Sequence, residues 1–436
     1  MSSWLLRSNP QIRTLFLGFM VIFLSLGCIR FLYPFQILNL GGDTILISIA
    51  SAVYSVGQVV GFLLIGLAFS CNRTRFLLGG IFLLLLMGVI SISTIPIVLT
   101  IARGFEGIGY GFLFLCIISI AAQFPDHEGE ALGALFASVF IGLAIGQGIA
   151  GFFWRSLIEI AYFSSTQAIQ VISAIGFTVI ALSMILLRIS FKRGAKEENQ
   201  ARKWNHFHLD QWFKMILSVP PIALLLIIYS LYDFAHGLYT PNLSILLNQQ
   251  GIDEIGLSFG YFIGDITWGI SQVFAGRLVD RIGHPLPLIL SLLLKGVVVI
   301  FYPYVGVAIL LFIVLFFAGL AEGFLEPARN KAALSVEMQQ DYIHSHLHLD
   351  LGFSSSGGFV LGIHKHEHKH ETQSESLVGT LQSIGILFFG FGSMFGSWLL
   401  LQGFSLETVT IIGGLCLSLA SITSCLFSLV LRKRKT

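Results

Sequence analysis

The stretch TLFLGFMVIFLSLGCIRFLYPFQIL, residues 14–38, contains one charged side chain among 25 residues. A hydrocarbon core about 30 Å thick needs about 20 apolar residues of helix, and a backbone in lipid must satisfy its own hydrogen bonds. This stretch therefore predicts a transmembrane helix. Similar stretches follow it at 44–69, 77–96, 97–123, 131–153, 166–189, 217–243, 256–278, 285–304, 307–335, 377–402 and 406–431.

The composition of the 436-residue chain agrees with a membrane location. Hydrophobic residues make up 55% and charged residues 11%, and the mean hydropathy is +0.85. Soluble domains carry about 25% charged residues. The five cysteines show no metal-type spacing, so we interpret them as small buried apolar residues. We expect an all-α membrane protein with 12 transmembrane helices in two six-helix halves around a central cavity.

The longest interior polar segment is basic and divides the chain. It covers 192–216, between a first half at 1–191 and a second half at 217–436. With the N-terminus inside, the outer loops hold essentially one basic residue, Arg155. Because basic residues concentrate on the cytoplasmic side, we expect both termini in the cytoplasm and the protein in the plasma (inner) membrane. The inner segments hold Arg7, Arg13, Arg73, Arg75, Arg188 through Lys214, Arg277, Arg281, Lys365, Lys369 and Arg432–Lys435.

The two halves contain a weak internal repeat. GIGYGFLFLCIISIAAQF at 107–124 and GLAEGFLEPARNKAALSV at 319–336 share glycines at matching positions, Gly107 with Gly319 and Gly111 with Gly323. Repeated halves that face each other across a midplane site are typical of secondary transporters.

The segment GRLVDRIGH at 276–284 resembles the cytoplasmic motif Gly-x-x-x-Asp-Arg-x-Gly-Arg of the major facilitator superfamily. Gly276, Asp280, Arg281 and Gly283 match, and His284 takes the last place. We expect Gly276 to allow close helix approach, Gly283 to take a backbone shape that other residues resist, and Asp280 to face a helix N-terminus. The resemblance implies a gate between alternating-access states. The alternative is an ordinary charged loop.

A second resemblance concerns the fifth predicted span, SVFIGLAIGQGIAGFFW at 138–154. It is similar to the antiporter motif Gly-x-x-x-Gly-Pro-x-x-Gly-Gly, with Gln147 in place of the proline, and so favours export slightly. Plain helix packing explains the glycines equally well.

The chain also resembles the drug:proton antiporter and vesicular amine branch, in which an acidic residue precedes a proline by five positions, as Glu322 precedes Pro327.

Four residues are candidates for proton coupling: Glu322, Glu326, Asp233 and His236. Glu322 and Glu326 are four apart and share a helix face, and Arg329 lies three beyond Glu326. A mid-membrane carboxyl has its charged form destabilised, so it can load and release a proton, and Glu322 is the first choice. The alternatives are a structural Glu326–Arg329 pair and a solvated Glu322.

Other polar residues of the predicted spans are candidates for the substrate cavity. Arg30 in the first span would attract anions or zwitterions. The alternative is that Arg30 pairs with Asp43 or extends to the membrane surface. A structural pair between neighbouring helix positions is the alternative for Arg103 and Glu106, and a mutual buried pair is the alternative for Asp265 and Lys295. The full set is Arg30, Tyr33, Arg103, Glu106, Asp265 and Lys295.

Seven histidines lie in the segment 342–376, which we expect to be a cytoplasmic loop. Alternating histidines on a flexible tract can bind Zn²⁺, Ni²⁺ or Cu²⁺ loosely, although the spacing is not that of a structural zinc site. The alternative is a solvated low-complexity insertion. These histidines are His344, His346, His348, His364, His366, His368 and His370.

These observations favour a proton-coupled secondary transporter that moves a small organic solute by alternating access, as a monomer. One alternative is a carrier of a divalent metal or metal chelate with the histidine segment as sensor. Another is a non-transporting membrane receptor. The sequence contains no nucleophile triad, phosphate loop or nucleotide fingerprint, so we expect neither an enzyme, nor a cofactor, nor a nucleic-acid partner.

Overall fold

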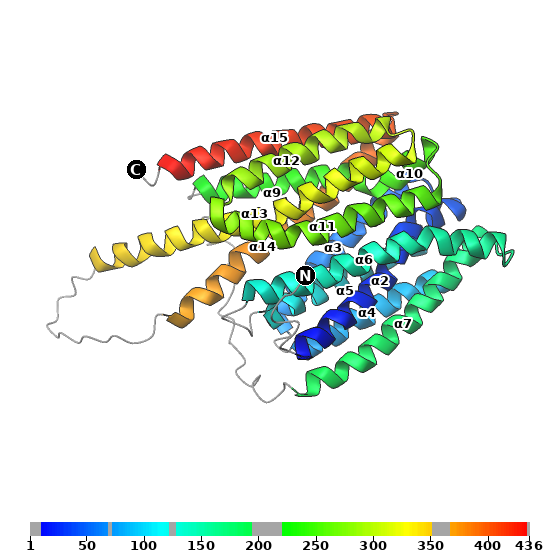
Figure 1. Cartoon of the computed structure of the whole chain (residues 1–436), viewed down its shortest axis with the longest axis horizontal. Coiled ribbons are helices and arrows are strands. Elements are labelled where there is room, and N and C mark those ends of the chain that lie inside the picture. The colour runs from blue at the N-terminus through cyan, green and yellow to red at the C-terminus, as the bar shows by residue number, and fades with distance from the viewer. Residues whose placement is uncertain (1–9, 69–71, 122–127, 194–219, 351–366, 434–436) are drawn as a thin grey trace.

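The computed structural model describes residues 10–68, 72–121, 128–193, 220–350 and 367–433, and the regular elements of these ranges are all helices (Figure 1). The first half contains α2 (Pro10–Asn39), α3 (Thr44–Ala68), α4 (Asn72–Ile92), α5 (Pro96–Ala121), α6 (Glu128–Glu159) and α7 (Ser165–Arg193). The second half contains α9 (Pro220–Tyr239), η1 (Thr240–Asn242), α10 (Leu243–Gln249), α11 (Glu254–Ile282), α12 (Pro285–Phe301), η2 (Tyr302–Tyr304), α13 (Ala308–Asp350), α14 (Glu367–Leu401) and α15 (Leu406–Lys433).

Eleven of the described helical segments are long and apolar enough to cross a membrane. The twelfth, α11, has 29 residues but mixes glycine, serine and Asp265 with its apolar side chains. It packs against α6 on one side and α13 on another, so neighbouring helices rather than lipid cover much of its polar surface. The predicted 12-helix architecture is confirmed.

Turn chemistry sets the boundaries of α11. The Asp253 side chain accepts a hydrogen bond from the backbone N–H of Gly256 at 2.9 Å and so caps the first turn. At the other end Gly283 has φ of 82°, which the absence of a Cβ permits. The unusual backbone predicted for Gly283 is therefore present.

Within each half, helices approach closely at the repeated glycines. A Cβ at Gly107 on α5 would collide with the Tyr54 carbonyl oxygen on α3. A Cβ at Gly319 on α13 would collide in the same way with the Gly264 carbonyl oxygen on α11. The repeat noticed in the sequence therefore corresponds to equivalent helix crossings in the two halves.

The halves meet along two helix pairs, α6 with α11 and α3 with α14. The glycines of α6 divide between two faces: Gly142 and Gly146 face α2, whereas Gly148 and Gly151 face α11. A Cβ at Gly148 would lie 2.9 Å from the Phe262 Cβ. The fifth-span glycines thus pack both inside the first half and between the halves.

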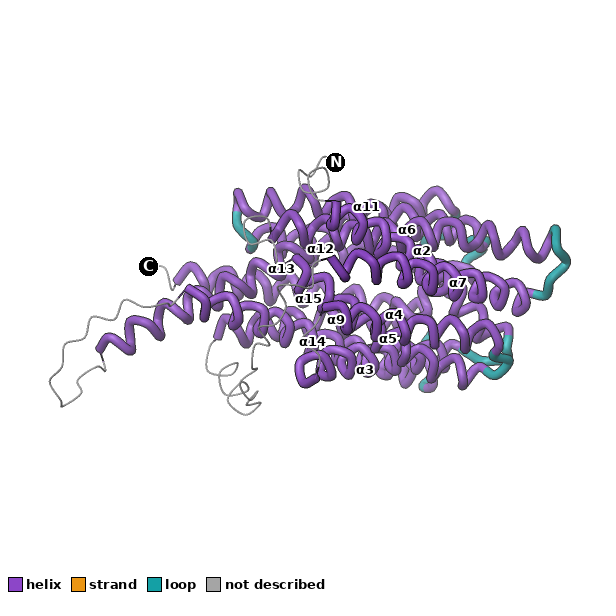
Figure 2. The backbone as a smooth tube through the Cα atoms, turned by 90° about the horizontal axis from the view of Figure 1, so that it is seen from below, coloured by secondary structure: helices purple, strands orange, loops and turns teal. Residues whose placement is uncertain are grey.

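Polar contacts join the halves at the end of the bundle that carries the turns after α2, α6 and α10, drawn at the right of Figure 2. Asn242 of η1 donates to Ser48 Oγ of α3 at 2.7 Å. Arg155 of α6 lies 3.4 Å from the carboxylate of Asp253. We call this the closed end.

Two predictions about the chain's second half need correction. Among the described residues, no atom lies within 4 Å of a Cβ placed at Gly276, so the close helix approach predicted there is wrong for this part of the structure. The segment 342–376 is only partly a loop, because α13 continues to Asp350 and α14 begins at Glu367. Residues 336–350 lack glycine and proline, so nothing in them interrupts the helix.

Candidate functional site

A cluster of two arginines and one carboxylate lies on α2 and α5 of the first half. Glu106 is fully buried and accepts from Arg30 Nε at 2.6 Å. Arg103 Nη1, one helical turn before Glu106, contacts the other carboxylate oxygen. The Arg103–Glu106 pair is therefore present. Arg30 does not pair with Asp43, which instead caps α3 by accepting from the Leu46 N–H at 2.8 Å.

Tyrosine rings cover the faces of both guanidinium groups. The Arg30 guanidinium carbon lies 5.0 Å from the Tyr110 ring centroid, and Arg30 Nη2 donates to Tyr54 OH at 3.0 Å. The Arg103 carbon lies 4.8 Å from the ring of Tyr33, whose hydroxyl donates to the Leu99 carbonyl at 2.6 Å. Cation–π contacts of this kind stabilise guanidinium groups that have lost water.

In the second half, Lys295 of α12 and Glu322 of α13 form a buried ion pair. Their Nζ and Oε1 atoms are 2.9 Å apart, and 6% and 4% of the two side chains are accessible. The Tyr232 hydroxyl of α9 donates to the other Glu322 oxygen. Glu322 is thus not solvated, and Lys295 pairs with Glu322 rather than with Asp265.

Arg329 of α13 forms ion pairs with two carboxylates. Its Nη2 lies 3.0 Å from Glu326 on the same helix, and its Nη1 lies 3.5 Å from Asp233 on α9. The Tyr229 ring centroid is 4.3 Å from the guanidinium carbon. A Cβ at Gly385 would collide with the Asp233 carboxylate, so this glycine makes room for the group.

Asp265 and His236 make looser contacts. Asp265, near the middle of α11, is half-buried, and no ion pair joins it to a described residue. It interacts electrostatically with Arg30 of the first half, and the Gln147 amide of α6 lies beside it. His236 makes ring contacts with the neighbouring aromatic side chains, at centroid distances of 5.7 Å to Tyr232 and 5.4 Å to Tyr239.

The described residues therefore form one cluster of charged side chains in each half, and Asp265 of the second half interacts with Arg30 of the first. We call these clusters the charged walls: Arg30, Arg103 and Glu106 form the first-half wall, and Asp233, Asp265, Lys295, Glu322, Glu326 and Arg329 form the second-half wall. Comparison with known proteins identifies the architecture: residues 15–336 match the family model of the Major Facilitator Superfamily. The chain belongs to this superfamily. It is a membrane transporter, not an enzyme. The more specific drug:proton branch stays a prediction.

Solved structures show the same superfamily fold. The nucleoside transporter NupG is similar with a TM-score of 0.66 and 11% identity, over 96% of this chain and 99% of that one. The human organic anion transporter MFSD10 (TETRAN) is similar with a TM-score of 0.61 and 14% identity, over 96% of this chain and 100% of that one. None of the curated proteins matches this chain.

Two predicted sites of this superfamily member lie partly or wholly outside the described side chains. Gly276, Arg281 and Gly283 of the gate motif belong to the end of α11, with Arg281 exposed, whereas the Asp280 side chain is outside the described part. The side chains of all seven histidines of the predicted metal-binding segment also lie outside the described part, and His364 and His366 fall in the undescribed range 351–366. In the part of the chain that the structure covers, no group of three metal-ligating side chains could hold an ion.

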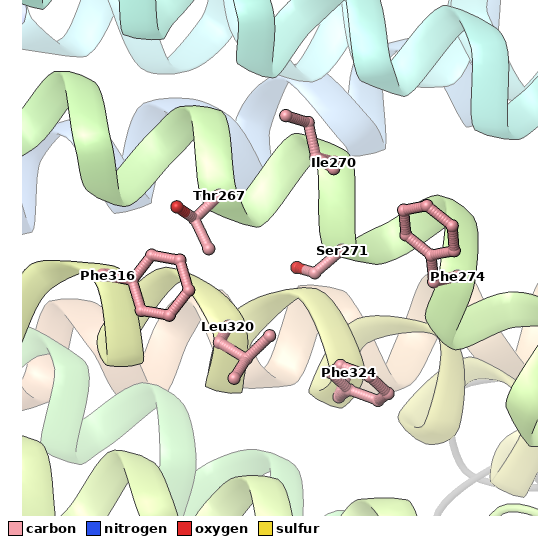
Figure 3. A pocket seen from close by; sticks show the side chains of 7 residues that line it. All are labelled: Thr267, Ile270, Ser271, Phe274, Phe316, Leu320 and Phe324. Atoms are coloured by element: carbon pink, nitrogen blue, oxygen red, sulfur yellow. The ribbon is translucent and has the colours of Figure 1, made fainter. Parts of the chain in front are cut away.

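A groove of about 390 Å³ runs between α11 and α13 (Figure 3). No ionisable side chain lines it, so it is separate from the charged walls. Ile270 and Phe274 at its rim are 50% and 60% exposed, as expected for side chains that contact lipid. The lining consists of Thr267, Ile270, Ser271, Phe274, Phe316, Leu320 and Phe324.

The sequence reasoning missed the tyrosines and the glutamine that accompany the charges. The sequence contains a signal for the tyrosines. Tyrosines of membrane proteins concentrate at the membrane–water interfaces, so a tyrosine near the middle of a predicted span indicates polar surroundings. The missed residues are Tyr54, Tyr110, Tyr229, Tyr232 and Gln147.

Proposed function

We propose that this transporter couples the movement of a small organic solute to protons. The supporting observation is the balance of charge on the two walls. Arg30 and Arg103 share Glu106, which leaves the first-half wall with one excess positive charge. The second-half wall has four carboxylates and two basic groups, hence an excess of two negative charges. The carboxylates are Asp233, Asp265, Glu322 and Glu326, and the basic groups are Lys295 and Arg329.

Two carboxylates contact Arg329, and one of them is the best candidate for the group that carries the coupling proton. Glu322 has a basic partner of its own in Lys295, so that pair is neutral without a proton. Asp233 and Glu326 share one guanidinium, so one proton on either makes that triad neutral. Glu326 has 23% of its side chain accessible, against 4% for Glu322, and can exchange its proton with water more readily.

The proton would move as the two halves alternate. In our proposal both termini are cytoplasmic, so the closed end faces outward and the conformation is inward-facing. No described atom lies within 4 Å of a Cβ placed at Gly276, which agrees with this, because the proposed gate motif lies at the opposite end. We further propose that the protein works as a monomer in the plasma (inner) membrane and that it exports its solute.

Transport in proteoliposomes tests this function. A thermal-shift screen of organic compounds, siderophores and Zn²⁺ on the purified chain first selects a solute. We expect an imposed pH gradient to drive its accumulation in liposomes that contain the wild-type protein. Glu326→Gln should lose this gradient-driven accumulation and keep solute counterflow, because only the proton step is removed.

The matched control is Glu407→Gln, which changes a carboxylate in the first turn of α15, remote from the charged walls. It should accumulate the solute as the wild type does. The proposal is wrong if Glu326→Gln and Asp233→Asn both retain full pH-gradient-driven accumulation.

A further inference from the structure

We propose that Arg30 and Arg103 bind the carboxylate of the transported solute, so that the substrate class is aromatic carboxylates. This inference rests on the proposed function and concerns the first-half wall of the same site. It is based on the N–H groups of the two arginines that do not donate to Glu106.

The arginine cluster has spare hydrogen-bonding capacity. Glu106 engages Arg30 Nε and one terminal nitrogen of Arg103. Arg103 Nε is buried without a partner. The Nη1 group of Arg30 is likewise without a partner among the described residues, since its hydrogen bonds use Nε and Nη2. An unpaired buried donor such as Arg103 Nε is costly. Arg30, with 22% of its side chain accessible, presents the donor that a solute can reach.

The geometry favours a planar anion that approaches edge-on. Glu106 lies behind the arginines with no accessible surface, whereas 22% of Arg30 and 14% of Arg103 are accessible. Tyr110 covers a face of the Arg30 guanidinium, while Glu106 and the Tyr54 hydroxyl occupy its edge at Nε and Nη2. The Nη1 side of that edge is left for a ligand. A carboxylate matches two donors of a guanidinium fork in one plane, which a cation or a neutral amide does not.

Asp265 is an acidic side chain of the second half that interacts with Arg30. It lies on α11, and the interaction is electrostatic, although no ion pair joins the two in the described structure. A solute carboxylate would take over the interaction with Arg30 and would be repelled by Asp265. Removing the Asp265 charge should therefore strengthen anion binding.

The body of the solute has an aromatic surface to contact. Tyr110 stacks with Phe114 at a centroid distance of 6.1 Å, and Phe114 meets Phe136 of α6 at 5.1 Å. Glu106, Tyr110 and Phe114 are four residues apart in turn, so they share one face of α5. This half-buried row begins at the arginines and leads away from the closed end. An aromatic ring attached to the bound carboxylate would stack on it.

Ligand-induced thermal stabilisation of the full purified chain tests the inference. The probes are indole-3-acetate and 4-hydroxyphenylacetate, with the amines tryptamine and tyramine and the neutral indole-3-acetamide as matched controls. We expect only the carboxylates to raise the unfolding temperature. Arg30→Gln should weaken their apparent affinity by about tenfold or more, Arg30→Lys by less, and Asp265→Asn should strengthen it by about tenfold.

Stabilisation by the amines instead, equal protection of wild type and Arg30→Gln, or no stabilisation by either carboxylate overturns the inference. The unfolding temperature of each variant measured in the absence of ligand shows whether the substitution itself disturbs the structure. If Arg30→Gln does not fold, Arg30→Lys, which keeps the positive charge, provides the comparison. The proposed function fails separately. If Glu326→Gln and Asp233→Asn both bind indole-3-acetate normally and both still accumulate it when a pH gradient is imposed, proton coupling is refuted and the carboxylate site is left intact.

Discussion

Lys295 and Glu322 form a one-to-one ion pair between α12 and α13, with Nζ 2.9 Å from Oε1 and almost no accessible surface on either side chain. The two helices pack against each other, and the Tyr232 hydroxyl from α9 completes the surroundings of the carboxylate. The pair therefore joins three helices of the second half. Each charge depends on the other, because neither has water to replace its partner.

Removal of one partner should destabilise the fold strongly. In Lys295→Met the Glu322 carboxylate loses its only cationic partner in the described structure, and breaking such a buried pair costs about 3–5 kcal/mol. We expect a clear fall in the unfolding temperature of the detergent-purified protein, followed by differential scanning fluorimetry.

The double variant Lys295→Met with Glu322→Gln provides the control. It removes both charges and should recover much of the lost unfolding temperature, because replacing a complete buried pair is far cheaper than breaking one. A double variant as unstable as the sum of the two single variants would show that the pair has no coupling energy.

Two glycines should respond oppositely to the same substitution. Gly107→Ala places a methyl group against the Tyr54 carbonyl oxygen, where neither backbone can yield easily, so α3 and α5 must separate. Gly276→Ala meets nothing within 4 Å and gains helix propensity of about 1 kcal/mol. We expect Gly107→Ala to lower the unfolding temperature by several degrees and Gly276→Ala to leave it unchanged or raise it.

The architecture and the pairs within one helix were predictable from the sequence. Helix length and hydropathy depend on local composition, and bilayer thickness sets the length that is needed. Glu326 with Arg329, and Arg103 with Glu106, are three residues apart, so helix geometry alone brings each pair together.

Pairs between helices were not predictable in the same way. The alternative to a cavity role for Lys295 is a pair with Asp265, but Lys295 meets Glu322. The alternative for Arg30 is a pair with Asp43, but Arg30 meets Glu106. The choice depends on the rotation and axial shift of one helix against another, and these are set by the packing of small side chains such as Gly107 and not by the charged residues themselves.

The contact of Gly151 with α11 predicts a variant that biases the conformation. A Cβ at Gly151 would lie 2.5 Å from the Glu254 carbonyl oxygen, across the interface between the halves. Gly151→Val should therefore open the closed end without disturbing the packing inside either half. Thiol labelling of a cysteine placed at Ser48 should be faster in this variant. Gly88→Val, whose nearest contact is an aromatic carbon at 3.8 Å, should label as the parent does.

The hydrogen bond between Asn242 and Ser48 predicts a reversible lock. Nδ2 of Asn242 and Oγ of Ser48 are 2.7 Å apart across the two halves, a separation compatible with a disulfide after backbone adjustment. On a background without the five native cysteines, Ser48→Cys with Asn242→Cys should cross-link under mild oxidation. The cross-link should stop transport, and a reductant should restore it, because alternating access requires this end to open. Each single cysteine variant should transport with or without oxidant. Full transport by the cross-linked protein would mean that the two halves do not separate at the closed end.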